Sequence, residues 1–314
     1  MNKKFLAAFL FFINTFAWAQ QNVEFVIPFA QGGTADKLAL ILLGPLKTEL
    51  SQVGITPVLT YKPGGGSTLA TNYVAKSSQV KIFLAPNAVV TAPIVNRSIA
   101  TYNVDTDLVP LEFIGHLPML LVTNSQSDLT TIKELQRQCH QRNITYGSAG
   151  IGSATHIASV IALNTLGCPG THVPYKGVGP ALIDLQGNHI SIVTDFEASI
   201  RPYIDSRIFR PLLSLSRSRN SDFPRVPSMA DIGVPNFDFY NWFIIAVNSS
   251  APQDDITKIQ AALKRVMLDK DLQRQLHEVG FQGIGTPITK SFLANESTKF
   301  EKIINKININ GLSR

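Results

Sequence analysis

Short apolar runs alternate with segments of helical periodicity along most of the chain. Runs rich in Val, Ile, Phe, Tyr and Thr predict strands at 23–29, 55–61, 80–86, 117–123, 143–148, 171–175, 189–195, 209–216 and 242–247. Apolar positions at helical spacing predict helices at 35–50, 69–75, 132–138, 154–166, 181–185 and 198–204, before a long C-terminal helical region. Such alternation is typical of parallel sheets with crossover helices, so we expect an α/β fold.

The strand–helix series starts twice. A first series fills the N-terminal third, and a second restarts at residue 117. The strand at 209–216 leaves the second series, and the chain then returns to the first through a strand at 242–247 and the C-terminal helices. We therefore expect two lobes joined by crossover strands, lobe one from residues 20–116 and 217–314, and lobe two from residues 117–216. Ligands of such sheets bind beyond the carboxyl ends of the strands, so the cleft between the lobes is the expected site.

The first 19 residues have the three parts of a secretory signal peptide. Lys3 and Lys4 precede an apolar run at 5–13, and small residues flank Trp18. The apolar run is shorter than the roughly 20 residues that a membrane crossing needs. We expect cleavage before Gln20 and export to the periplasm; a buried N-terminal strand is the less favoured alternative.

Charge and histidine content exclude several classes of function. The chain of 314 residues has a net charge of +6, and without the two leader lysines the balance is 26 − 22 = +4. No cluster of Lys or Arg accompanies this mild charge, which argues against a nucleic-acid partner. The six histidines contain no pair at i, i+4, so the pattern supports no metal site.

Two cysteines are compatible with one disulfide. Cys139 and Cys168 each lie just before a predicted strand, and they share one end of the sheet if those strands are parallel neighbours. In an oxidising compartment we expect them to be bonded, and two buried free thiols are the alternative.

Residues 144–158, ITYGSAGIGSATHIA, form a glycine-rich loop between a predicted strand and a predicted helix. A Walker loop would need a Lys, and a dinucleotide fingerprint would need Gly where Thr155 stands. The elbow of an esterase would need Gly in place of Tyr146. An exported hydrolase with Ser148 or Ser153 as nucleophile therefore stays a minor alternative.

Helix starts after such loops are natural anion sites. Their first N–H groups have no partner in the helix, and the helix dipole adds positive potential. Ser153 can cap the second helix, while Gly150 and Gly152 allow a close approach of the backbone to a ligand. PFAQGGTAD at 28–36 offers the same arrangement with Thr34 as its cap. Two such starts across a cleft would clamp a small anion, although ordinary turns into helices are the plain alternative.

Five ordered segments carry a family resemblance. VIPFAQGGTAD, YKPGGGST, TYGSAGIGSATHIA, HVPYKGVGPALIDLQG and PRVPSMADIGVP resemble segments of the Bug/TctC family of periplasmic solute-binding proteins. This resemblance implies a type II periplasmic-binding-protein fold that closes on a small carboxylic acid, without a cofactor and without catalysis. It also implies a monomer that delivers the acid to a tripartite tricarboxylate transporter; a membrane sensor kinase is the alternative partner.

Carried over by position, the resemblance predicts the ligand-binding residues. They are Phe29, Gln31, Gly32, Gly33, Thr34, Asn87, Ser148, Ala149, Gly150, Gly152, Ser153 and Asp195. Tyr175 and His156 are further candidates; a half-buried core position for Tyr175 and plain packing for His156 are the alternatives. Glu197 replaces an apolar position of the family and faces either the cleft or solvent. Trp242 and Phe243 lie in an apolar strand, and we expect both in the core.

Overall fold

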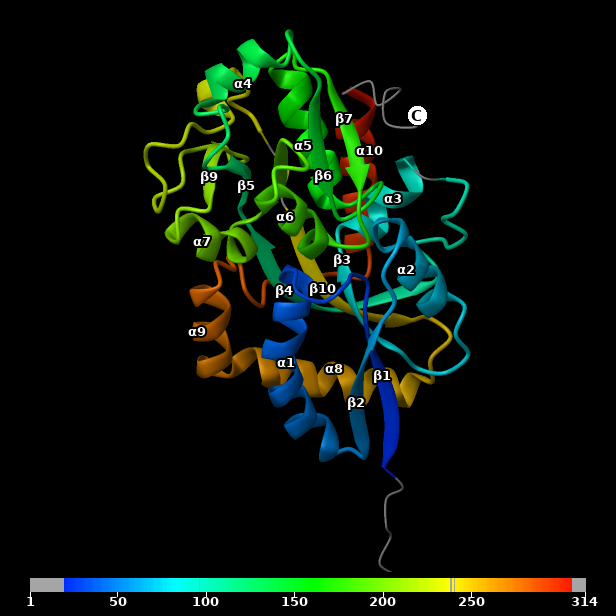
Figure 1. Cartoon of the computed structure of the whole chain (residues 1–314). Helices are drawn as coiled ribbons and strands as arrows, with labels where there is room; N and C mark the ends of the chain where they lie inside the picture. The colour runs from blue at the N-terminus through cyan, green and yellow to red at the C-terminus, as the bar shows by residue number, and fades with distance from the viewer. Residues whose placement is uncertain (1–19, 96, 238, 240, 307–314) are drawn as a thin grey trace, which may run out of the picture.

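The computed structural model describes residues 20–95, 97–237, 239 and 241–306, and its helices and strands form two lobes (Figure 1). The lower lobe in that view has strands β1 (Gln21–Ile27), β2 (Ile55–Tyr61), β3 (Ile82–Pro86), β4 (Leu108–Leu117) and β10 (Asn241–Asn248). Its helices are α1 (Thr34–Ser51), α2 (Thr68–Ala75), α3 (Ala88–Val95), α8 (Gln253–Leu268), α9 (Lys270–Glu278) and α10 (Phe292–Lys306). The upper lobe has strands β5 (Met119–Asn124), β6 (Ile144–Ser148), β7 (Gly170–Pro174), β8 (Ile192–Phe196) and β9 (Phe209–Ser214). Its helices are α4 (Ile132–Gln138), α5 (Ala154–Thr165), α6 (Val178–Gln186) and α7 (Glu197–Asp205).

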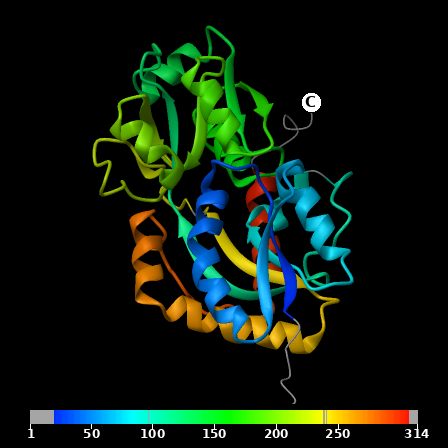
Figure 2. The same ribbon diagram turned by 60° about the horizontal axis from the view of Figure 1, so that its bottom comes forward.

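Each lobe is built on one five-stranded sheet. The strand order is β2–β1–β3–β10–β4 in the lower lobe and β7–β6–β8–β5–β9 in the upper lobe. Apolar side chains such as Phe25 and Ile27 of β1 are fully buried. Helix α1 packs against α8 and β2, and α8 also contacts β4 (Figure 2). The α/β fold with two lobes is confirmed.

The sheets are mixed, where the alternating pattern predicted parallel sheets. β1 pairs parallel with β2 and β3, but β10 runs antiparallel to β3 and β4. In the upper sheet β5 runs antiparallel to β8 and β9. Both exceptional strands follow the connections between the lobes, β5 after β4 through Pro118 and β10 after the segment 215–240. A strand that arrives from the other lobe enters its sheet from the opposite end, and this reverses its direction.

The pattern of apolar positions did not predict two elements of the structure, helix α3 and strand β4. Helix α3 is apolar nearly all round, with Ala88 to Ala92 buried, so it has no amphipathic pattern. Strand β4 contains Pro110 and Gly115, which read as breaks in a strand.

Cys139 and Cys168 are disulfide-bonded in the structure, with their Cα atoms 5.5 Å apart. Strands β6 and β7 pair parallel, with Ile144 opposite Gly170, so the two cysteines before them meet at one end of the sheet. Of the two alternatives left by the sequence, the structure has the bonded one.

The predicted signal peptide, residues 1–19, lies outside the described residues. Within the described part of the chain, no helix has both the length and the apolar character that a membrane crossing requires.

Candidate functional site

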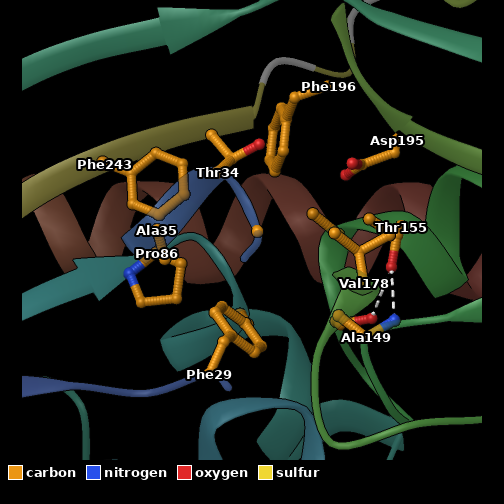
Figure 3. Close-up of a pocket in the computed structure, with 14 residues that line it drawn as sticks. Phe29, Thr34, Ala35, Pro86, Ala149, Thr155, Val178, Asp195, Phe196 and Phe243 are labelled. Atoms are coloured by element: carbon orange, nitrogen blue, oxygen red, sulfur yellow. Dashed lines mark hydrogen bonds between the residues drawn. The ribbon is translucent and has the colours of Figure 1, made fainter. Parts of the chain in front are cut away.

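A cavity lies between the lobes, where β1, β3, β6 and β8 end (Figure 3). Lobe one lines it with Phe29, Gly33, Thr34, Ala35, Pro86, Ala88 and Phe243, and lobe two with Ala149, Ser153, Ala154, Thr155, Val178, Asp195 and Phe196.

Helix α1 begins at the cavity with unpaired N–H groups. Its N-cap is Gly33, which has no side chain to offer, and the amides of Thr34 and Ala35 have no acceptor among the described residues. Asp36 holds the preceding loop in place, because its Oδ2 accepts from the Gly32 amide at 2.8 Å and its Oδ1 from the Tyr61 hydroxyl at 2.6 Å. The amides of Thr34 and Ala35 are therefore available to an anion.

The predicted cap of α1 is wrong. Thr34 is the first residue of the helix, and its hydroxyl hydrogen-bonds to that of Ser199 in lobe two instead of capping the helix. A second hydrogen bond links the same two helices, because Lys37 Nζ of α1 donates to the Ala198 carbonyl of α7 at 3.3 Å. The start of α1 is thus tied to the start of α7 across the cleft.

Helix α5 begins on the opposite side of the cavity. Ser153 caps it as predicted, because its hydroxyl accepts from the His156 amide at 3.2 Å. The amides of Ala154 and Thr155 have no acceptor among the described residues, and the Thr155 hydroxyl accepts from the Ala149 amide at 2.8 Å (Figure 3). Two helix starts, one from each lobe, thus offer N–H groups to the same cavity.

Gly150 and Gly152 do not line the cavity; they lie against lobe one. A Cβ on Gly150 would meet the Gly66 amide nitrogen at 2.8 Å, and a Cβ on Gly152 would meet the Ala92 Cα at 2.7 Å. Both glycines have positive φ, and a Cβ on Gly66 would come within 2.1 Å of the Ile151 carbonyl oxygen. We call Gly66, Gly150 and Gly152 the glycine seam. Their small size allows backbone-to-backbone contact of the lobes rather than the expected approach to a ligand.

Two buried, neutral histidines, His156 and His172, lie against the loop between β6 and α5 and hold it in place. His156 Nδ1 accepts from the Gly152 amide at 3.1 Å, and the His156 ring stacks on that of His172 with centroids 4.0 Å apart. Burial, with His172 as a like-charged neighbour, lowers the pKa of His156 well below its usual value, and burial lowers the pKa of His172 to about 4. Both rings are therefore neutral at pH 7, as an acceptor of an amide proton must be.

Ser148 and His172 form a close pair, at 2.6 Å between Oγ and Nε2. Such a pair suits a nucleophile, but Ser148 is fully buried and does not line the cavity, and its Oγ accepts from the Gly150 amide at 3.1 Å. The hydroxyl of Ser153 is occupied as the helix cap. The geometry assigns both serines to holding the loop and gives the hydrolase alternative no support.

Among the described residues, Asp195 is the one ionisable side chain that lines the cavity. It is fully buried, and neither carboxyl oxygen has a hydrogen-bond partner among the described residues. Burial raises the pKa of Asp195 to about 7; the neighbouring Ser199 side chain, the Phe196 backbone and the charge of Lys37 lower it part of the way. In Figure 3 the carboxyl group points toward the ring of Phe196.

Other predicted ligand residues lie near the cavity without lining it. Asn87 lies in the sequence between the lining residues Pro86 and Ala88, and it is buried. Its side-chain amide donates to Asn241 Oδ1 at 2.9 Å. The Tyr175 hydroxyl donates to Asp184, away from the cavity. Gln31 and Gly32 are exposed on the loop before α1. His156 and Ser148 act beneath the loop, as described above.

Apart from Phe29 and Ala149, the sequence missed the apolar part of the lining. Ala35, Pro86, Ala88, Ala154, Thr155, Val178, Phe196 and Phe243 contact the cavity but were not predicted there. Phe243 was expected in the core; it is buried and lines the cavity as well, whereas Trp242 packs on Phe292 and donates to Glu296. No sequence signal separates a buried side chain beside a cavity from one within a core.

Glu197 faces neither the cleft nor solvent. Its side chain is buried, and its carboxylate accepts from Arg201 at 2.6 Å and from Asn220 at 2.5 Å. Arg201 is in turn bonded to Asp222. Glu197 thus fixes the 217–232 segment to α7 and contributes nothing to the cavity.

The cavity has no positively charged side chain. None of the lining residues of the described chain is Lys, Arg or His, and the described residues contain no group of His, Cys, Asp and Glu fit to hold a metal ion. Attraction for an anion therefore comes from the two helix starts. Asp195, when ionised, repels an anion and attracts a cation or a hydrogen-bond donor.

Comparison with known proteins agrees with the two-lobed fold. The sequence profile of the tripartite tricarboxylate transporter family receptor matches residues 46–309. The protein BugT of Bordetella pertussis is 29% identical over 294 residues, which cover 90% of this chain and 88% of BugT. Among solved structures, the periplasmic binding protein BugD superposes with a TM-score of 0.83 at 24% identity, covering 93% of this chain and 98% of BugD. MatC of Rhodopseudomonas palustris, solved with bound malate, superposes with a TM-score of 0.81 at 22% identity, covering 91% and 98%.

Proposed function

Because the chain belongs to the tripartite tricarboxylate transporter receptor family, we propose that it binds a small carboxylic acid and delivers it to a transporter of that class. The proposed site is the cavity between the lobes. The acid is held by the starts of α1 and α5, and the apolar lining surrounds the rest of the molecule.

The observation that carries this proposal is the pair of unpaired helix starts. The amides of Thr34 and Ala35 come from lobe one, and those of Ala154 and Thr155 from lobe two. Helices of 18 and 12 residues stand behind them, so both dipoles favour an anion in the cavity. Since one carboxylate can contact both starts only when the lobes are together, binding favours the closed arrangement.

Direct contacts between the lobes support a hinged closure. The Ala30 amide donates to the Lys176 carbonyl at 3.1 Å, and the Thr91 hydroxyl donates to the Gly152 carbonyl at 2.6 Å. We propose lobe boundaries of 20–116 with 217–314 and of 117–216, in keeping with the strands of the two sheets. The hinge then comprises the β4–β5 connection and the segment between β9 and β10.

Thermal unfolding of the mature chain with a panel of carboxylic acids tests the proposal. A ligand at about 100 times its dissociation constant adds roughly 2.7 kcal/mol to the free energy of unfolding, which raises the melting temperature measurably. The amides of the same acids serve as controls, because they lack the charge that the helix starts recognise. No shift with any acid, after removal of bound ligand by unfolding and refolding, would reject the proposal.

A further inference from the structure

A groove follows the flank of lobe two and shares no lining residue with the cavity. It lies between α4, strand β9 and the 217–232 segment, which Figure 1 shows together at the upper left of the molecule. We call it the flank groove. Its apolar lining includes buried Leu212 and Val226, half-buried Phe223, and the side chains of Ile132 and Ile204.

Positive charge is in excess along the flank groove. Four basic residues line it, Lys133, Arg210, Arg219 and Arg225, against two acidic residues, Asp222 and Asp231. Both acids already have a partner, because Asp231 accepts from Arg219 at 3.0 Å and Asp222 accepts from Arg201 of α7. The acids of the groove therefore do not neutralise its other three cations.

Those three cations have no carboxylate of their own. Arg210 is half-buried and donates only to backbone carbonyls, to that of Ser125 at 2.8 Å and that of Ser127 at 3.4 Å. Lys133 and Arg225 are exposed, and neither forms an ion pair with another of the described residues. Guanidinium groups match carboxylates in shape and charge, so the groove is complementary to an acidic partner.

The mixture of arginine with apolar side chains favours a protein segment as that partner. Arginine and aromatic residues are enriched at protein interfaces, where apolar contacts lie inside a polar rim. An extended peptide can reach half-buried Arg210 and Phe223 within the groove, whereas the surface of a membrane meets only the side chains at its rim.

The flank groove also includes part of the chain that joins the lobes. The 217–232 segment lies between β9 of lobe two and β10 of lobe one, and Arg201 of α7 lies over the Phe223 ring at 5.4 Å. Glu197 at the start of α7 accepts from Asn220 of the segment at 2.5 Å, and Ser199 in the same helix hydrogen-bonds to Thr34 across the cleft. A partner in the groove therefore contacts a segment whose anchors reach the start of α1.

We propose that the flank groove docks an acidic, extended segment of the membrane partner. Its carboxylates pair with Lys133, Arg210 and Arg225, and its apolar side chains pack on Phe223 and Val226. This inference rests on the proposed function, because it assigns the surface by which a transporter recognises the receptor.

Fluorescence anisotropy with labelled synthetic peptides tests the proposal. The probes are short overlapping peptides that cover the extracytoplasmic segments of the membrane subunits of tripartite tricarboxylate transporters from the same organism. We expect at least one peptide rich in Asp and Glu to bind. Its counterpart with Asn and Gln at those positions should bind at least tenfold more weakly, because it lacks the charges that the groove recognises.

Charge reversal assigns the binding to the groove. Arg225→Glu and Lys133→Glu should each weaken the acidic peptide at least tenfold, and a peptide with Lys in place of its Glu residues should bind Arg225→Glu more tightly than it binds the wild type. Lys47→Glu makes the same change at an exposed lysine of α1 in lobe one and should retain the wild-type affinity. None of the three residues lines the cavity, so the thermal shift with carboxylic acids should be unchanged in all the variants, which also verifies that they are folded.

The outcomes separate the two proposals. Binding of no peptide, or equal binding of the acidic peptide to the wild type and Arg225→Glu, would overturn the docking assignment. Vesicles of phosphatidylglycerol that bind the wild type but not Arg225→Glu, with every peptide inactive, would overturn it in favour of a membrane surface. The receptor proposal fails separately, through the absence of a thermal shift with any carboxylic acid, which is measured without peptides.

Discussion

Replacing Asp195 by Asn should stabilise the ligand-free protein at neutral and alkaline pH. The carboxyl is fully buried without a hydrogen-bond partner among the described residues, and its pKa is raised from 3.8 to about 7. An amide of nearly the same shape imitates the protonated carboxyl and never carries the charge. The variant therefore removes the cost of burying an ionised group.

The sign and size follow from proton linkage. Below pH 3.8 the carboxyl is protonated in the folded and unfolded chains, and it costs nothing extra. As the pH rises toward 7 the unfolded chain loses this proton first, so the folded state is progressively destabilised, and above pH 7 the loss is constant. A shift of about three pKa units corresponds to roughly 4 kcal/mol, so Asp195→Asn should exceed the wild type by up to that amount at pH 8 and match it near pH 4.

Urea unfolding at several pH values measures this difference. Wild type, Asp195→Asn and the surface control Asp128→Asn are compared after refolding from denaturant, which removes retained ligand. The difference between variant and wild type isolates Asp195, since His172 titrates equally in both. A difference in free energy of unfolding that stays flat between pH 4 and pH 8, or a variant less stable than wild type at pH 8, would refute the reasoning.

Three further predictions concern the loops and the disulfide. Gly66→Ala puts a Cβ 2.1 Å from a lobe-two carbonyl oxygen, so it should hold the lobes apart and weaken ligand binding at least tenfold. X-ray scattering should then give a larger radius of gyration. In the control Gly44→Ala the new Cβ meets nothing within 4 Å, so neither the affinity nor the radius should change. His156→Leu leaves a loop amide without its acceptor, at a cost of about 1–3 kcal/mol, and should speed hydrogen exchange in the loop; slow exchange as in wild type would contradict the role assigned to the imidazole. Replacing Cys139 and Cys168 together by Ser opens a link across 29 positions and should lower the free energy of unfolding by about 3–4 kcal/mol, so an unchanged urea midpoint would count against a bond that stabilises lobe two.

Much of the frame could be predicted because it depends on local pattern. The start of α5 follows from a β-branched run, small residues and Ser153 as a cap, all within a few positions of the chain. The mixed sheets could not be predicted in this way, because the direction of β10 depends on where the chain crosses between the lobes.

The site was predictable where the chemistry is polar and local, and unpredictable where it is apolar or depends on distant partners. Gly33 and Ser153 follow from loop sequences, whereas Val178 and Phe243 look like ordinary core residues until the lobes are brought together. The orientation of Glu197 was unpredictable for the same reason. Its carboxylate is held by a hydrogen bond from Asn220, which lies 23 positions further along the chain. Only tertiary structure decides such pairings.

The glycine seam sets how far the lobes can approach each other. Backbone meets backbone at Gly66 and Gly150, so further closure is stopped by the main chain and not by the ligand. On the proposed function, any acid small enough to let the seam meet leaves the same outer surface on the closed protein. A membrane partner of the proposed kind that docks on that surface would meet one geometry, whatever the shape of the bound acid.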